Sequence, residues 1–131
     1  MKKTSILLLF TVFCSTQNIQ TYAEMNPFFS EFKTPYNIPP FELIKDEHYR
    51  PAFYRAMESH LNEVDAITSN IESPSFANTI IALERSGKDL DVVSSTFFNL
   101  QSSNTNDLMD EIAAEIGPQL SGHNDSIYLN K

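Results

Sequence analysis

Residues 47–67 read EHYRPAFYRAMESHLNEVDAI, and this stretch predicts the first helix of the chain. Its apolar residues recur at steps of three and four positions and continue just beyond it: Phe53, Met57, Leu61, Val64, Ile67 and Ile71. This spacing places them along one face of an α-helix. We expect the helix to begin at residues 48–50, with Pro51 in its first turn, where a missing backbone N–H costs nothing. It should end at residues 70–73, before Pro74.

Two further helices are expected after Pro74. Ser75 suits the N-cap of the first, because its hydroxyl oxygen accepts an unpaired backbone N–H, and Ser86-Gly87 is a typical stop. The second spans residues 88–101. The sequence leaves open whether Gly87 breaks one long helix or only bends it, since a glycine inside a helix costs only about 1 kcal/mol. The apolar stripes are Phe76, Ile80 and Leu83, then Leu90, Val93, Phe97 and Leu100.

The last helix is expected to follow a cap at Asn104 or Thr105, with Asp107 near the positive end of the helix dipole. Its apolar stripe is Leu108, Ile112, Ile116 and Leu120. We expect Gly117-Pro118 to kink this helix, because proline removes a backbone hydrogen bond. No convincing stretch alternates between apolar and polar residues as a strand would. The predicted fold class is therefore all-α, built of antiparallel helices.

An extended strap at residues 24–41 is expected to precede these helices. Its prolines stand too close together for a helix: Pro27, Pro35, Pro39 and Pro40. Large apolar side chains lie among them: Phe28, Phe29, Phe32, Tyr36, Ile38 and Phe41. A flexible linker has little use for so many, so we expect the strap to pack across another hydrophobic surface. Disorder is the alternative.

Residues 1–23 have the pattern of a secretory signal peptide. Lys2 and Lys3 are followed by an apolar run at 6–14 and by a cleavage pattern at Thr21-Tyr22-Ala23. The run is too short for a membrane span, which needs about 20 residues. A buried N-terminal helix and a lipoprotein anchored at Cys14 are weaker alternatives. We predict export, to the periplasm or outside the cell, with no membrane span after cleavage.

Charge and composition exclude several classes of protein. The 131 residues include 9 Lys+Arg against 17 Asp+Glu, a formal net charge of −8. Because this chain has no excess of cations to neutralise phosphates, we expect neither a nucleic-acid partner nor an electrostatic grip on anionic membranes. The length allows one compact domain at most. Its one cysteine falls in the predicted signal peptide, so residues 24–131 contain no disulfide.

Candidate chemistry centres on three histidines: His48, His60 and His123. His60 and Glu63 match the start of an H-x-x-E-H zinc helix, but Val64 stands where the second histidine is required. The H-E-x-x-H motif is absent from the sequence. His48 is expected to cap or to pack at a helix entrance.

His123 and Asp125 would suit a base and its orienting carboxylate, but no nucleophile is evident near them, which favours a structural role. Asn124-Asp125-Ser126 matches a glycosylation pattern that is common by chance. The remaining acidic candidates are simpler as solvated charges: Glu42, Asp46 and Glu47. We therefore assign no catalytic, cofactor-binding or metal-binding residue to this chain.

Several blocks along the chain carry a family resemblance. They are NPF at 26–28, EHYRPAF at 47–53, FANTI at 76–80, ALERSG at 82–87, FFNL at 97–100, NTND at 104–107 and DSIYLN at 125–130. In this order they resemble the N-terminal region of the thimet-oligopeptidase-like zinc metallopeptidases, and among these the peptidyl-dipeptidases. The blocks at 76–87 and 104–107 are the most specific.

The resemblance implies a mostly helical enzyme much longer than this chain. In that family an H-E-F-G-H-type motif and a later Glu hold zinc in the C-terminal half, and members hydrolyse short peptides. Peptidyl-dipeptidases release dipeptides from the C-terminal end of the substrate. None of these zinc or catalytic residues has a counterpart at 24–131, so the resemblance implies no cofactor in this chain. It implies packing and capping roles for the matched blocks, and a C-terminal catalytic domain as partner.

Two hypotheses follow for residues 24–131. In the first, they are the N-terminal helical segment of an exported zinc oligopeptidase, interrupted at Lys131 where the family continues, and inactive alone. In the second, they form a stand-alone helical binding module that kept the scaffold without the chemistry. The helical stripes and the strap offer more apolar surface than four short helices can hide from one another, which favours the first hypothesis.

Overall fold

The computed structural model describes residues 26–129, so the predicted signal peptide at 1–23, with Cys14, lies outside the described residues. Within them there are helices and no strand, which confirms the all-α class. None of the described helices is both long and apolar enough to cross a membrane. The elements are η1 (Pro27–Phe29), η2 (Pro35–Asn37), α2 (Asp46–Thr68), η3 (Phe76–Ile81), α3 (Ala82–Arg85), α4 (Lys88–Ser103) and α5 (Asp107–Tyr128).

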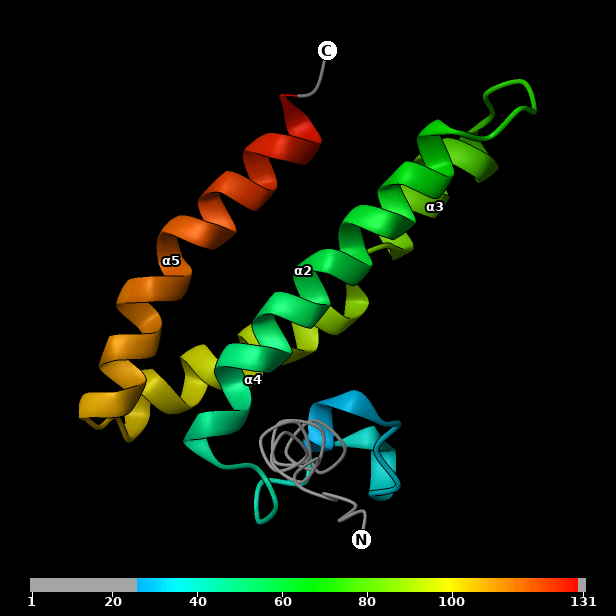
Figure 1. Ribbon diagram of the computed structural model, residues 1–131. Coiled ribbons are helices and arrows are strands. Elements are labelled where there is room, and N and C mark those ends of the chain that lie inside the picture. Colours follow the sequence, from blue (N-terminus) through cyan, green and yellow to red (C-terminus); the bar gives the residue numbers. More distant parts are fainter. Residues whose placement is uncertain (1–25, 130–131) are drawn as a thin grey trace, which may run out of the picture.

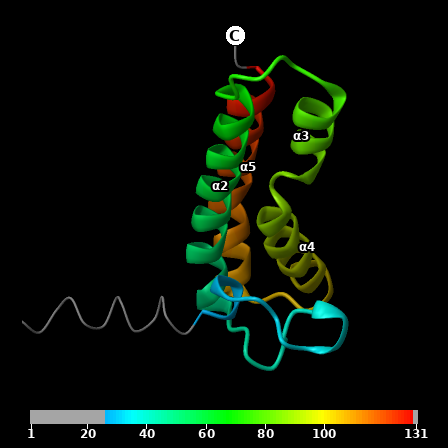
Figure 2. The same cartoon turned by 90° about the vertical axis from the view of Figure 1, so that its right-hand side faces the viewer.

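Helix α2 packs against both of the other long helices, α4 and α5. In Figure 1, α2 and α5 run upward and α4 runs downward, so α4 is antiparallel to α2 as predicted. Helices α2 and α5 are parallel, because the chain runs back through α3 and α4 between them. Figure 2 shows α3 above α4, on the same side of α2.

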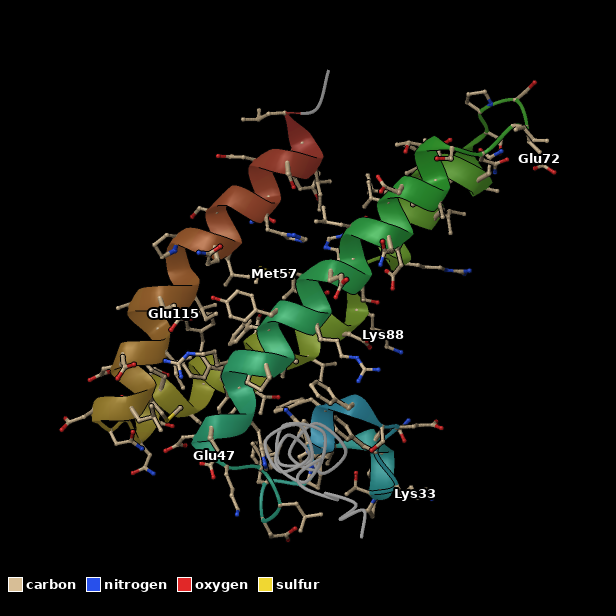
Figure 3. All side chains as sticks on the ribbon, viewed as in Figure 1. Lys33, Glu47, Met57, Glu72, Lys88 and Glu115 are labelled. Carbon is tan, nitrogen blue, oxygen red and sulfur yellow. The ribbon has the colours of Figure 1, made fainter. Side chains whose placement is uncertain are left out.

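Burial divides the described molecule into two halves. We call proximal half the residues 26–57 and 88–116, and distal half the residues 58–87 and 117–129; Met57, Lys88 and Glu115 mark the boundary in Figure 3. The buried apolar side chains are all proximal: Tyr49, Ala52, Phe53, Ala56, Met57, Leu90, Val93, Phe97, Met109, Ile112 and Ile116. In the distal half, as far as it is described, His123 is the only buried side chain.

The proximal core is built around a cluster of aromatic rings. Phe97 of α4 meets Tyr49 and Phe53 of α2 edge to face, at ring-centroid distances of 5.0 and 5.4 Å. Phe28 of the strap packs on Tyr49 at 5.5 Å. Burial of each such side chain stabilises the fold by about 1.5–3 kcal/mol. Burial, and then the charge of Asp46, raises the pKa of the Tyr49 phenol to about 12.

Helix α2 begins at Asp46, earlier than the predicted start at 48–50. The His48 ring explains the difference, since the Lys45 N–H donates to His48 Nδ1 over 3.1 Å, and this confirms the capping role of His48. Pro51 therefore lies inside the helix rather than in its first turn. As a result the Glu47 carbonyl has no helical N–H partner.

The distal part of the α2 stripe is at most half-buried, contrary to the prediction, with Val64 and Ile67 half-buried. Helix α2 ends at Thr68, before the predicted 70–73, and Ile71 in the following loop is fully exposed. Leu61 is also exposed, whereas Phe53 and Met57 are buried as predicted. The reason is that the element packed against this end of α2 is short, since α3 has 4 residues and none of them is buried.

The segment predicted as a helix after Ser75 is irregular. Ser75 is its N-cap as predicted: the Asn78 N–H donates to Ser75 Oγ over 3.1 Å, and the Ser75 N–H donates to Asn78 Oδ1 over 2.7 Å. A π-helical turn, η3, then precedes α3, and Phe76 and Ile80 are exposed rather than part of a buried stripe. Gly87 separates α3 from α4, because its φ of 71° is a left-handed conformation that only glycine adopts readily.

Helix α5 is capped one or two residues later than predicted. The cap is Asn106, whose Oδ1 accepts the Met109 N–H over 3.0 Å, and not Asn104 or Thr105. The Thr105 hydroxyl instead donates to a carboxylate of the first helical turn. The cap at Asn106 therefore directly precedes the first turn of α5, where the acidic residues Asp107 and Asp110 favour a helix N-terminus.

The predicted kink at Gly117-Pro118 does not interrupt α5, which runs as one helix through both residues. The ring of Pro118 leaves the Ala114 carbonyl without its helical N–H. Pro118 and Ala114 are both exposed, so water can bond to this carbonyl. The helix therefore tolerates the proline on its solvent-facing side.

The strap packs over its first part only. The Asn26 side chain donates to the His48 carbonyl over 2.8 Å, and Phe28 and Phe29 lie against the core. The second part does not pack as predicted, because Tyr36 is 96% exposed and has a φ of 60°. The exposed apolar side chains of this part are Tyr36, Ile38 and Phe41.

Candidate functional site

The structure brings two of the three candidate histidines together. His60 of α2 and His123 of α5 face each other in the distal half, with 2.9 Å between His60 Nδ1 and His123 Nε2. His48 lies at the opposite end of α2, where it caps the helix. The two facing histidines are therefore the centre of the candidate site.

Ser86 extends this pair at the connection between α3 and α4. Its Oγ lies 3.2 Å from His60 Nε2, and its hydroxyl donates to the Leu83 carbonyl over 2.7 Å. Three segments far apart in the sequence thus meet in one chain of hydrogen bonds. We call His123, His60 and Ser86 the histidine relay. The sequence analysis did not identify Ser86 as part of any site.

The direction of every hydrogen bond in the relay follows from the Ser86 hydroxyl. Because that hydroxyl donates to the Leu83 carbonyl, its oxygen accepts a hydrogen bond from the N–H of His60 Nε2. A neutral imidazole carries one N–H, so His60 Nδ1 then has a lone pair. This lone pair accepts the N–H of His123 Nε2. The relay is consequently complete with both rings neutral.

Gly87 and Glu63 hold the backbone beside the relay. The Gly87 N–H donates to Glu63 Oε2 over 2.7 Å, which satisfies a backbone donor at the start of α4. A Cβ at Gly87 would lie only 2.8 Å from the His60 ring. The position thus needs glycine for its backbone angle and for the space that the ring occupies.

The relay has the order of nucleophile, base and orienting group, but its hydrogen bonds run the wrong way for catalysis. A nucleophilic serine must give its proton to the histidine, whereas Ser86 donates to Leu83 and accepts from His60. Among the described residues, Asp125 is not a hydrogen-bond partner of His123. In this arrangement the geometry of the relay suggests no serine nucleophile.

The donor set does not fit a catalytic zinc site. Among the described residues, no three side chains of His, Cys, Asp or Glu converge as metal ligands. His60 and His123 are two nitrogen donors, and Glu63 is held by Gly87. A catalytic zinc needs three protein ligands and an open position.

A second polar group connects α2 and α5 on the proximal surface. Arg50 bonds to Glu115 over 2.7 Å and to Glu111 over 3.0 Å, and the Tyr54 hydroxyl donates to Glu115 over 2.8 Å. The hydrogen bonds from Tyr54 and Arg50 lower the pKa of the Glu115 carboxyl. Because this group is partly exposed, water and salt screen it.

One open cavity of about 380 Å³ lies between η1, α2 and α4. Arg55 borders it, with its guanidinium 4.4 Å from the centre of the Phe29 ring. Ser59 and Asp89 add polar groups to the lining. The cavity holds no histidine or cysteine, and its charged side chains are exposed, so its geometry suggests no reaction.

Two known proteins have sequences similar to this chain. No family model matches the chain. It is 41% identical over 106 residues to a dipeptidyl carboxypeptidase of Escherichia coli strain K12, a match that spans 81% of this chain. It is 38% identical over 105 residues to a dipeptidyl carboxypeptidase of Salmonella typhimurium, across 80% of this chain. This chain resembles the dipeptidyl carboxypeptidases. The peptidyl-dipeptidase resemblance predicted from the sequence blocks is thus confirmed.

The matches cover 16% and 15% of these two dipeptidyl carboxypeptidases, so the chain spans about a sixth of their length.

Within the blocks that resemble them, the structure gives local roles to particular residues. Asn78 and Asn106 form helix caps, and Gly87 separates two helices. Tyr49 and Phe97 lie in the core. These residues pack or cap, as the resemblance implied, whereas Phe76, Ile80 and Tyr128, which also lie in matched blocks, are exposed.

Proposed function

We propose that this chain forms the helical scaffold segment of an exported zinc-dependent peptidyl-dipeptidase, and that it does not hydrolyse peptides by itself. The similarity to two dipeptidyl carboxypeptidases over four fifths of the chain carries this proposal. The absence of an H-E-x-x-H motif from the sequence supports inactivity. Zinc, when bound in the family, activates water for attack on the peptide carbonyl. In this proposal the zinc ligands lie in a separate catalytic domain.

The proposed partner of the chain is this catalytic domain. Several large apolar side chains of the distal half are exposed, and a partner surface would shield them from water: Leu61, Ile71, Phe76, Ile80, Tyr128 and Leu129. The net charge of −8 makes nucleic acid an unsuitable partner. Short peptides are the proposed substrates of the assembled enzyme. The role of this chain is to present a preformed helical surface to the catalytic domain.

A chimera tests the proposal directly. The 106 matched residues of the Escherichia coli dipeptidyl carboxypeptidase are replaced by the corresponding residues of this chain. We expect dipeptide release from a short peptide within about tenfold of the parent enzyme, because the groups that stabilise the transition state are unchanged. A matched deletion of the same segment should lose activity. A folded, zinc-loaded chimera without activity would contradict the scaffold role.

The isolated chain provides the second test. We expect no cleavage of a short peptide by the purified 131-residue protein, with or without added zinc, as followed by mass spectrometry. The active chimera serves as the positive control in the same assay. Zinc-dependent cleavage that a chelator abolishes would refute the proposed inactivity.

Export is tested separately from peptidase function. We expect a bacterium expressing the full chain to deliver to the periplasm or the medium a product whose N-terminal residue is Glu24. A variant with Leu7, Leu8 and Leu9 changed to Gln should stay uncleaved in the cytoplasm. Cytoplasmic retention of the unmodified chain would refute the export proposal.

The alternative function is a stand-alone helical binding module. The fully buried cluster of Tyr49, Phe53, Phe97, Ile112 and Ile116 favours it, because such a core can support a fold of its own. Size-exclusion chromatography and thermal melting followed by circular dichroism distinguish the two candidates. A cooperative transition of a monomer would favour the module. Aggregation, or melting without cooperativity, would favour dependence on a catalytic domain.

A further inference from the structure

The histidine relay has a second property, which concerns its protons. With both rings neutral, His123 Nε2 donates to His60 Nδ1 over 2.9 Å. One added proton can be accommodated, because a doubly protonated His60 ring still donates to a His123 ring whose proton has moved to Nδ1. A second added proton places an N–H on both facing nitrogens. The contact then has two donors and no acceptor, so it must open.

The surroundings of the relay oppose the charged state. His123 is 6% exposed, and burial, followed by the charge of His60, lowers its pKa. On the α3–α4 connection the facing group is the Ser86 hydroxyl, which carries no charge. On α2 the nearest carboxylate that the contacts identify is Glu63, which is bonded to Gly87. The other ionisable residues nearby in sequence are exposed to solvent: Glu84, Arg85, Lys88 and Asp125.

The distal half has less apolar packing than the proximal half, because its apolar side chains, such as Val64, Leu83 and Leu120, are at most half-buried. Among the described residues 58–87 and 117–129, His123 is the only buried side chain. Leu61 and Ile80, which lie on the elements around the relay, are exposed. Segments with few buried apolar contacts open locally at low free energy. Loss of the contact between the two histidines is therefore compensated by less apolar packing than a lost contact in the proximal half would be.

We propose that the contact between His60 and His123 is an acid-sensitive latch, which holds the C-terminal part of α5 against α2 when neutral and releases it when both histidines are protonated. The sign follows from proton linkage. A histidine whose pKa is lowered by folding binds protons more readily in the open form, so opening becomes easier as the pH falls below its usual value of 6.5. Above that pH the latch is closed.

Hydrogen exchange of the full chain, followed by mass spectrometry between pH 7.5 and pH 5, tests the latch. After correction for the intrinsic exchange rate, we expect protection of amides 119–128 to fall by about tenfold, the factor for one pH unit of linkage. Amides 109–116 should keep their protection, because the aromatic core does not titrate in this range. An equal loss in both segments would show global unfolding and overturn the proposal.

Three variants identify the titrating groups. We expect His123→Gln, whose amide can still bond to His60, to abolish the pH dependence of amides 119–128. His48→Gln is the matched control and should leave this dependence unchanged, since His48 caps the opposite end of α2. Ser86→Ala retains both histidines but removes the acceptor of His60 Nε2, so release should begin at higher pH. Unchanged pH dependence in both His123→Gln and Ser86→Ala would refute the latch.

Discussion

Different interactions stabilise the proximal and the distal half of this molecule. In the proximal half, α2, α4 and α5 close over aromatic and aliphatic side chains, and five of these are almost completely buried. In the distal half the same α2 and α5 continue, and a hydrogen bond between two imidazoles joins them there. Apolar burial is insensitive to pH and scales with area, whereas the relay depends on the protonation of two groups.

This difference shows that one helix can serve two purposes along its length. The first three turns of α2 carry the residues that fix the fold, such as Tyr49 and Phe53. The later turns carry His60 and exposed apolar side chains, which leave the distal end adaptable. Similar division of stability is common in proteins, where the less stable end is the one that moves or binds. The predictions below test whether the halves are energetically distinct.

The largest effect is expected from the proximal core. Phe97→Ala removes the ring that contacts both Tyr49 and Phe53, and should lower the free energy of unfolding by about 3–5 kcal/mol. Urea denaturation followed by circular dichroism measures this loss. The neighbouring Phe98, which is 38% exposed, provides the control, and Phe98→Ala should cost about 1 kcal/mol or less. Equal losses in the two variants would mean that the proximal half has no dominant core.

The next effect is expected at the junction of the halves. Gly87→Ala should destabilise by about 1–2 kcal/mol for the left-handed backbone alone, and the new Cβ would also displace the His60 ring. Gly122→Ala is the matched control, because nothing lies within 4 Å of the position of its Cβ. This control should be stabilising by about 0.5–1 kcal/mol, since Gly122 lies inside a helix. A neutral Gly87→Ala would show that the distal half accommodates the strain by opening.

A smaller loss is expected at the start of α5. Asn106→Ala removes the side chain that accepts the Met109 N–H, and should cost about 1 kcal/mol. Asn104→Ala tests the cap position predicted from the sequence and should change stability by less than about 0.5 kcal/mol. Thermal melting of the two variants measures the difference. The reverse order would place the cap at Asn104 after all.

Much of the proximal half could be predicted from the sequence, because periodicity directly reports a buried helix face. The stripe of Phe53 and Met57 and that of Ile112 and Ile116 are buried as expected. Periodicity does not report what covers a face, so Ile71 has the right spacing and is nevertheless exposed. The packing predicted for the strap, which rested on its number of large apolar side chains, was wrong for its second part. The first residues of α2 and α5 are set by hydrogen bonds to the side chains of His48 and Asn106. The spacing of apolar residues does not predict such bonds.

The histidine relay had a signal in the sequence that spacing could have revealed. His60 follows Phe53 at seven residues, and His123 follows Ile116 at the same interval, so each histidine continues a buried stripe. This places both on faces that turn toward the other helices. What the sequence does not supply is the relative height of α2 and α5, which brings the two rings into contact. Ser86 had no periodic signal, because it lies where two helices meet.

The smallest effect concerns the surface contact between α2 and α5 in the proximal half, and it separates the halves by pH. Hydrogen bonds from Tyr54 and Arg50 lower the pKa of Glu115 below its usual value of 4.5 in the folded state. The unfolded chain therefore binds a proton first, so the stabilisation is present above that pH and is lost as the pH falls through the lowered value.

Glu115→Gln should accordingly flatten the acid limb of the stability curve below about pH 4.5 and leave the limb below pH 6.5 unchanged, because the latter belongs to His123. Urea denaturation between pH 3 and pH 7.5 measures both limbs, and Glu111→Gln is the control, since Glu111 is the more exposed partner of Arg50. Added salt should diminish the Glu115 limb, because partly exposed charges are screened. If Glu115→Gln instead removed the limb below pH 6.5, the two halves would titrate as one unit and the distinction between them would fail.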